Sequence, residues 1–114
     1  MKKMRLQEKL DIIVNDLKGY DPEKIILFGS ASKGETDRYS DIDIVVIKNT
    51  NKTFLKRLKD LATLCSLDEP VDILAYTPDE VQRMLDQDSD FMKKILKEGK
   101  VIYEKQSPKR PKVA

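Results

Sequence analysis

Apolar residues along the chain form two kinds of pattern, one typical of amphipathic helices and one typical of buried strands. Apolar positions three and four residues apart predict helices over residues 6–17, 55–65, 78–85 and 91–98. Short continuous apolar runs predict strands over residues 24–28, 41–47, 71–76 and 100–103. The order of these elements favours an α/β (α+β) fold, in which helices flank one or both faces of a small mixed β-sheet.

Helix boundaries are marked by residues that cap or end helices. The segment Thr77–Glu80 has a Thr cap, a Pro at the first helical position and a Glu three residues after the cap, which together predict a capping box. Asn51 or Thr53 is the expected cap of the helix before it, and Gly99 is expected to end the last helix. Residues 30–33 are expected to form a short helical turn, followed by a polar loop.

The length of 114 residues is enough for one compact domain and not for two. We assign residues 1–104 to this domain and residues 105–114 to a basic tail that we predict to be disordered. The tail holds four of the 22 basic residues and no acidic one, so the rest has 18 basic against 20 acidic residues. Such a body is not a basic nucleic-acid-binding domain, although the tail leaves RNA binding open as a weaker alternative.

The cysteine and histidine content narrows the possible chemistry. Cys65 is the only cysteine, so no internal disulfide can form, which fits a cytoplasmic protein. No apolar stretch reaches the length of a membrane span or of a signal peptide, so we expect no membrane association. The chain has no histidine, which excludes Ser-His-Asp and Cys-His catalysis and leaves acid–base and metal chemistry to carboxylates.

Asp41 and Asp43 lie two residues apart at the start of the predicted second strand, so their side chains point to the same face. Residues 44–47 are all apolar, which indicates a buried strand where neighbouring carboxylates would repel each other. A bound divalent cation commonly compensates such repulsion between buried carboxylates. The alternative is that these residues occupy the solvent face of an edge strand.

Asp72 is a third acid in an apolar strand, within the run Val71–Leu74. If that strand lies beside the one with Asp41 and Asp43, three carboxylates converge and can hold two Mg²⁺ ions. Asp72 would then also be able to accept the proton of an attacking hydroxyl. The alternative for Asp72 is a strand-end cap.

Gly29 and Ser30 follow the first predicted strand directly. A glycine allows a sharp turn and a close approach of a phosphate, and Ser30 adds a hydroxyl and an N–H group at the start of a helical turn. Lys33 lies one turn later, where its charge would suit a phosphate. An ordinary strand–helix turn and a surface lysine are the alternatives.

The pattern Gly29-Ser30-x10-Asp41-x-Asp43, in the segment ILFGSASKGETDRYSDIDIVV, resembles the signature of the nucleotidyltransferase superfamily that includes DNA polymerase β. The short chain resembles its minimal nucleotidyltransferases, the MNT proteins. The resemblance runs from about Lys24 to Tyr76.

This resemblance implies a fold, a site and a reaction. Gly29 and Ser30 would bind a nucleoside triphosphate, Asp41 and Asp43 would bind Mg²⁺, and Asp72 matches the third family carboxylate. The reaction would be attack of a hydroxyl on the α-phosphate of a nucleotide, with release of pyrophosphate. Minimal members often pair with a helical HEPN protein, and in several pairs the MNT protein is an antitoxin that adenylylates a tyrosine of the HEPN toxin with ATP.

Two departures from the family pattern matter. The position of Lys33 is often arginine in the family, and lysine lacks the bidentate fork for phosphate. The chain also ends before any substrate-binding domain like that of larger members, so we expect the acceptor site to come from a partner or a second copy.

Two hypotheses follow. The first is a Mg²⁺- and ATP-dependent nucleotidyltransferase that modifies a HEPN-type partner protein, as the antitoxin of a toxin–antitoxin pair. The second is a non-catalytic nucleotide-binding module that neutralises its partner by binding alone.

Overall fold

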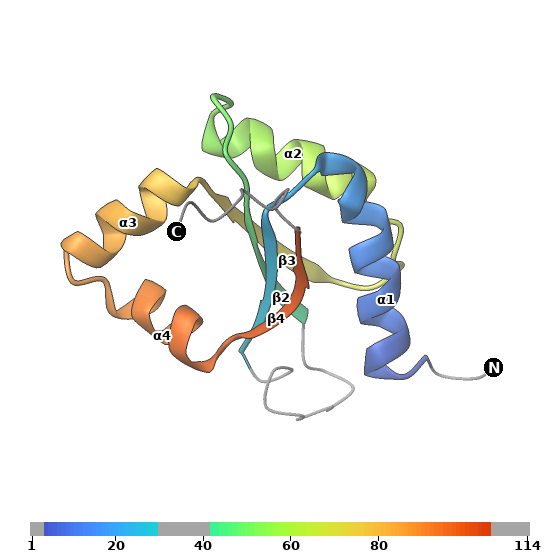
Figure 1. Cartoon of the computed structure of the whole chain (residues 1–114). Coiled ribbons are helices and arrows are strands. Elements are labelled where there is room, and N and C mark those ends of the chain that lie inside the picture. Colours follow the sequence, from blue (N-terminus) through green and yellow to red (C-terminus); the bar gives the residue numbers. More distant parts are fainter. Residues whose placement is uncertain (1–3, 30–41, 106–114) are drawn as a thin grey trace, which may run out of the picture.

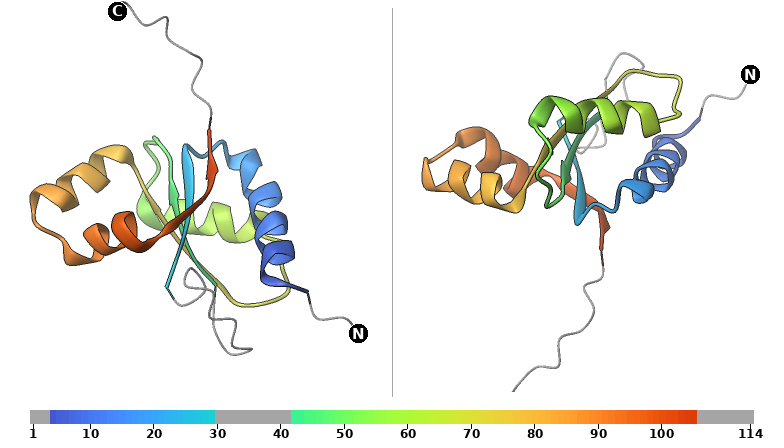
Figure 2. Two further views of the ribbon diagram at one scale, coloured as in Figure 1. Left: turned by 60° about the horizontal axis from the view of Figure 1, so that its bottom comes forward. Right: turned by 90° about the horizontal axis from the view of Figure 1, so that it is seen from above.

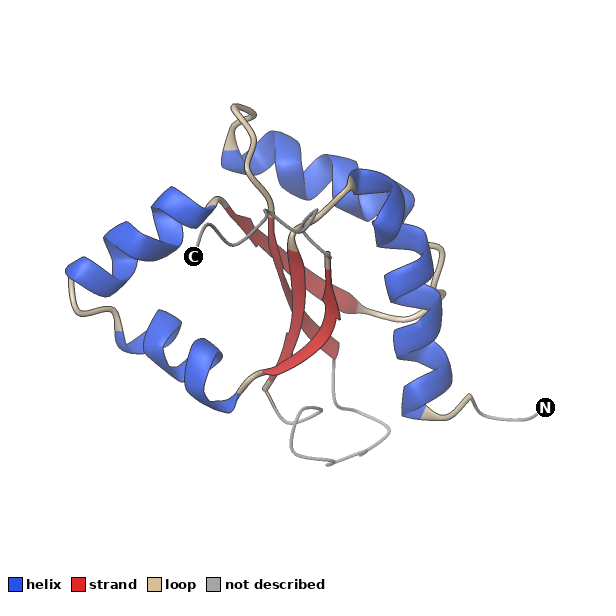
Figure 3. Cartoon of the chain, viewed as in Figure 1, coloured by secondary structure: helices blue, strands red, loops and turns tan. Residues whose placement is uncertain are grey.

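One four-stranded mixed sheet, in the order β3-β2-β1-β4, lies between helices on both faces (Figures 1 and 3). This computed structural model describes residues 4–29 and 42–105. The strands are β1 (Lys24–Phe28), β2 (Ile42–Ile47), β3 (Val71–Tyr76) and β4 (Lys100–Glu104). The helices are α1 (Leu6–Leu17), the 3₁₀ helix η1 (Lys18–Tyr20), α2 (Phe54–Leu64), α3 (Pro78–Asp86) and α4 (Asp90–Glu98). β1 is antiparallel to β2 and β4, whereas β2 and β3 are parallel.

Each face of the sheet has its own hydrophobic core because strand side chains alternate between faces. α1 and α2 cover one face, and α3 and α4 cover the other (Figure 2). The first core contains Leu10, Ile13, Leu17, Ile25, Leu27, Ile42, Ile44, Val46, Leu61 and Ala75. The second contains Ile26, Val45, Ile47, Met92 and Ile95. A sheet covered on both faces explains why β1 and β2 read as continuous apolar runs rather than alternating ones.

The predicted mixed α/β architecture is confirmed, and most element boundaries agree to within a residue or two. Thr53 caps α2, and the capping box at Thr77 is present with both of its hydrogen bonds. Cys65 is the residue that ends α2 rather than a member of its interior. The predicted turn at residues 30–33, the loop after it and the tail beyond residue 105 lie outside the described residues.

Helix α4 buries only part of its apolar pattern. Met92 and Ile95 are buried, whereas Phe91 and Leu96 are 43% and 44% exposed.

In residues 4–29 and 42–105, no helix is long and apolar enough to cross a membrane.

A buried arginine ties β3 to the two helices that flank it in sequence. Arg57 of α2 is only 6% exposed. Its Nη1 atom donates to the Ala75 carbonyl of β3 at 3.2 Å and to Glu80 Oε1 of α3 at 2.6 Å, and its Nε donates to the Lys52 carbonyl at 2.9 Å. Glu80 Oε1 also accepts from the Thr77 backbone N–H at 2.8 Å. The guanidinium is therefore compensated on several sides, as burial of a charge requires.

We expect Glu80→Gln to destabilise the protein by about 1–3 kcal/mol at pH 7, because it leaves the Arg57 charge without its carboxylate. The Arg57 hydrogen bond is the main cause that lowers the pKa of Glu80 below its ordinary value of 4.5. A lowered carboxyl pKa stabilises the fold above the unfolded pKa, and that stabilisation is lost as pH falls through the folded pKa.

Urea unfolding from pH 7 down to pH 3 measures this effect. The difference in free energy of unfolding between wild type and Glu80→Gln should be largest at pH 7 and should shrink as the pH falls below about 4.5. Glu98→Gln, at an exposed position of α4, is the matched control and should change little. A gap that is independent of pH would contradict the assignment.

Candidate functional site

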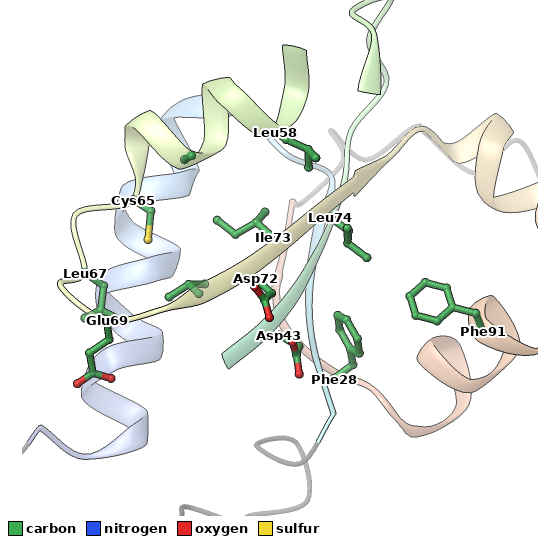
Figure 4. A pocket seen from close by; sticks show the side chains of 12 residues that line it. Phe28, Asp43, Leu58, Cys65, Leu67, Glu69, Asp72, Ile73, Leu74 and Phe91 are labelled. Carbon is green, nitrogen blue, oxygen red and sulfur yellow. The ribbon is translucent and has the colours of Figure 1, made fainter. Parts of the chain in front are cut away.

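Asp43 of β2 and Asp72 of β3 are register partners in the parallel strand pair. Parallel partners point to the same face, and neighbouring strands lie about 4.8 Å apart. Both aspartates lie on the face covered by α3 and α4, and Figure 4 shows their carboxylates projecting to the same side of the sheet. The two carboxylates therefore lie next to each other, although 29 residues separate them in sequence.

The surroundings of the two acids differ. β2 lies between β1 and β3, so Asp43 is not on an edge strand, and it is half-buried. This rules out, for Asp43, the alternative of a solvent-facing edge position. Asp72 is exposed, and β3 has no strand on its outer side in the described part of the chain. The pair therefore combines a carboxylate fixed in the middle of the sheet with one that remains accessible.

Gly29 lies directly against the Asp43 carboxylate. Its φ of 76° is in the region that favours glycine, and an added Cβ would lie 2.5 Å from Asp43 Oδ2. The preceding residue, Phe28, is the register partner of Asp43 on the antiparallel neighbour β1. Gly29 and the acid of β2 therefore meet at this end of the sheet.

We expect Gly29→Ala to destabilise the protein by about 2 kcal/mol, because it adds both backbone strain and a clash with Asp43. Gly19→Ala is the matched control, since no atom lies within 4 Å of its added Cβ. The control should fall within about 0.5 kcal/mol of wild type or be slightly stabilising. Thermal and urea unfolding measure both, and equal stabilities of the two variants would contradict this account.

An open cleft of about 590 Å³ contains both acids (Figure 4). It is lined by Phe28, Asp43, Leu58, Ala62, Cys65, Leu67, Glu69, Val71, Asp72, Ile73, Leu74 and Phe91. Val71 and Ile73 point to the α2 side of β3, whereas Asp72 and Leu74 point to the α4 side. The cleft therefore reaches around the outer edge of β3, with the two aspartates and two aromatic rings on one side and a mainly apolar surface with Glu69 on the other.

Three of the predicted site residues, Ser30, Lys33 and Asp41, lie outside the described residues. Of the predicted carboxylates, Asp43 and Asp72 are brought together. Within residues 4–29 and 42–105, no group of three or more potential metal-ligating side chains is found. Carboxylate oxygens are the donors that Mg²⁺ and Ca²⁺ prefer, so the chemistry of the pair fits a hard divalent cation.

Two aromatic residues of the cleft, Phe28 and Phe91, were not among the predicted site residues. Phe28 ends an apolar strand and Phe91 belongs to an apolar helical pattern, so the pattern alone does not mark either residue as part of a site. The sequence feature that could have indicated Phe28 is its position, since it immediately precedes Gly29 in the motif.

We expect Asp72→Asn to stabilise the metal-free protein by about 0.2–1 kcal/mol, because it removes a like charge opposite Asp43. We also expect Mg²⁺ to raise the melting temperature of the wild type more than that of this variant, since a ligand that binds the folded state stabilises it. Differential scanning calorimetry with EDTA or with Mg²⁺ measures both effects. Asp68→Asn, an exposed acid outside the cleft lining, is the control, and an equal Mg²⁺ response in all three proteins would contradict the prediction.

Comparison with known proteins identifies the class. The family model for "Polymerase beta, Nucleotidyltransferase" matches residues 8–108. The chain therefore belongs to the polymerase β-type nucleotidyltransferase family, which supports nucleotidyl transfer as its reaction class.

Individual relatives agree with this assignment. The chain is 33% identical, over 81 residues, to a protein of Methanocaldococcus jannaschii that is named as a putative protein adenylyltransferase. The match covers 71% of this chain and 78% of that protein. A solved structure of a putative nucleotidyltransferase from Sulfolobus solfataricus has the same fold, with a TM-score of 0.59 and 16% identity. It covers 92% of this chain and 93% of that one.

Proposed function

We propose that the protein transfers AMP from ATP to a hydroxyl group of a partner protein, with Mg²⁺ held by Asp41, Asp43 and Asp72. The observation that carries this proposal is the pairing of Asp43 with Asp72 on neighbouring strands, in an open cleft and against the Gly29 turn. Two like charges at facing positions of a sheet are destabilising unless other groups compensate them. A divalent cation that also binds a polyphosphate would compensate both carboxylates.

The proposed site residues fall into two groups, one that would bind phosphate and one that would bind Mg²⁺. Gly29, Ser30 and Lys33 are proposed to bind the triphosphate, because a glycine turn allows close approach of a phosphate and Gly29 lies beside the Asp43 carboxylate. The three aspartates would hold Mg²⁺. When bound, Mg²⁺ would supply positive charge that lowers the pKa of the attacking hydroxyl and offsets charge on the leaving pyrophosphate.

The reaction balances without any further reactant. The acceptor oxygen forms a bond to the α-phosphorus of ATP, and the bond from that phosphorus to the oxygen that bridges to the β-phosphorus breaks. Pyrophosphate leaves with that oxygen. The proton of the acceptor hydroxyl passes to Asp72, whose exposure on the edge strand leaves it accessible to an incoming group.

A protein acceptor is supported by the shape of the site and by one relative. The cleft is open and continues around the outer edge of β3, which suits a segment of another chain more than an enclosed small molecule. The Methanocaldococcus relative is named as a putative protein adenylyltransferase. We further propose a HEPN-type partner in a toxin–antitoxin pair, as the resemblance to MNT proteins implies.

Label transfer tests the proposal. The protein is incubated with Mg²⁺, ATP labelled at the α-phosphate, and the product of the adjacent gene. We expect label on the partner, and we expect Asp43→Asn to lower the transfer rate by about 100-fold or more, because the variant removes a proposed ligand of the Mg²⁺ that would position the reacting phosphate.

The control is Asp68→Asn, which should transfer label at the wild-type rate. Circular dichroism of Asp43→Asn must show an intact fold. Undiminished transfer by Asp43→Asn would refute the site assignment.

The second candidate function is neutralisation of the partner by binding alone, with nucleotide binding vestigial or regulatory. Lys33 favours it, because the family position is often arginine and lysine cannot make the bidentate contact with phosphate. A complex that forms without label transfer, and an Asp43→Asn variant that still neutralises the partner fully, would favour this function over the first.

A further inference from the structure

Two aromatic rings stand beside the carboxylate pair in the same cleft. Phe28 and Phe91 meet edge to face, with their ring centroids 6.0 Å apart and their planes at 90°. Phe28 is the last residue of β1 and is half-buried, whereas Phe91 lies in the first turn of α4 and is 43% exposed. Figure 4 shows Phe28 between Asp43 and Phe91.

Phe91 is not required by the packing of its own helix. Met92 and Ile95 form the buried face of α4, and Phe91 lies outside both hydrophobic cores. A singly exposed apolar residue is ordinary on a protein surface. Phe91 differs because it lines the cleft that contains the two acids, and because its ring is oriented by the edge-to-face contact with the better-buried Phe28.

The spacing of these groups suits a nucleotide. Phe28 faces Asp43 across an antiparallel strand pair, which places their Cα atoms about 5 Å apart. Phe91 lies on the far side of Phe28 from Asp43 (Figure 4), with 6.0 Å between the two ring centroids. A nucleoside whose α-phosphate lies at the carboxylates reaches that far with its base.

We propose that the nucleobase of the bound triphosphate stacks on the ring of Phe91, with Phe28 and Leu74 forming the surface beneath the ribose. This inference rests on the proposed function, because it needs a triphosphate at the carboxylates. Stacking on an aromatic ring is tolerant of base identity, since every base has a π-face. Phe91 therefore contributes affinity for the nucleoside rather than a choice between adenine and guanine.

Isothermal titration calorimetry with two probes separates the base from the phosphates. α,β-Methylene-ATP carries the nucleoside and cannot be cleaved at the reacting bond, whereas inorganic tripolyphosphate carries the phosphates alone. In the presence of Mg²⁺, Phe91→Ala should weaken α,β-methylene-ATP about tenfold and leave tripolyphosphate within twofold of wild type. Phe91→Tyr should keep wild-type affinity for both, because it keeps the ring.

Leu96→Ala is the matched control, an exposed apolar residue of the same helix that does not line the cleft. It should bind both probes as wild type does. The corresponding GTP analogue should lose as much affinity in Phe91→Ala as the ATP analogue does. Unchanged binding of both analogues by Phe91→Ala, or an equal loss for tripolyphosphate, would overturn the inference while leaving the carboxylate site intact.

Failure of the proposed function has a different signature. If wild type binds neither probe with Mg²⁺, or if Asp43→Asn binds tripolyphosphate as wild type does, the carboxylates are not the triphosphate site and the stacking inference falls with them. If tripolyphosphate binding depends on Asp43 and base binding depends on Phe91, the triphosphate site at the carboxylates and the stacking inference are both supported.

Discussion

The register between the parallel strands β2 and β3 is the constraint on which the site depends. It places Asp43 opposite Asp72, and a shift of one residue would turn one of the two carboxylates to the other face. The apolar residues hold this register, because Ile44 and Ala75 belong to the core under α1 and α2, whereas Val45 packs in the core under α3 and α4. Apolar packing further along the two strands therefore offsets the electrostatic repulsion between Asp43 and Asp72.

The Arg57 cluster supports this register at the other end of β3. An edge strand is held by hydrogen bonds on one side only, and β3 carries an exposed acid near its start. Arg57 binds the Ala75 carbonyl of β3 and, through Glu80, the first turn of α3. A charged group in the interior stabilises only when its hydrogen-bonding groups are matched, and here its partners come from β3, from α3 and from the loop before α2. The position of the strand that carries Asp72 is therefore fixed from α2.

Local features of the sequence predicted the helices, the strands and the capping box at Thr77, because periodicity and caps act over a few residues. The pairing of Asp43 with Asp72 depends on a contact between distant segments, so it could be predicted only on the condition that their strands are neighbours. Arg57 was missed because a lone arginine on a charged helix looks solvated. Phe91 was counted with the apolar pattern of α4, since the pattern alone does not decide which of two adjacent residues faces the core.

Several features that cost stability lie at one end of the sheet. Gly29 has a positive φ against a carboxylate, Asp43 and Asp72 face each other, and Phe91 leaves its ring in solvent. Elsewhere the described sheet is closed by apolar cores on both faces. The Mg²⁺–nucleotide complex proposed above would contact each feature: a phosphate at the Gly29 turn, a cation at the acids and a base on the ring. Because the three features differ in physical cost and lie beside one cleft, the proposed ligand would give them a common functional cause.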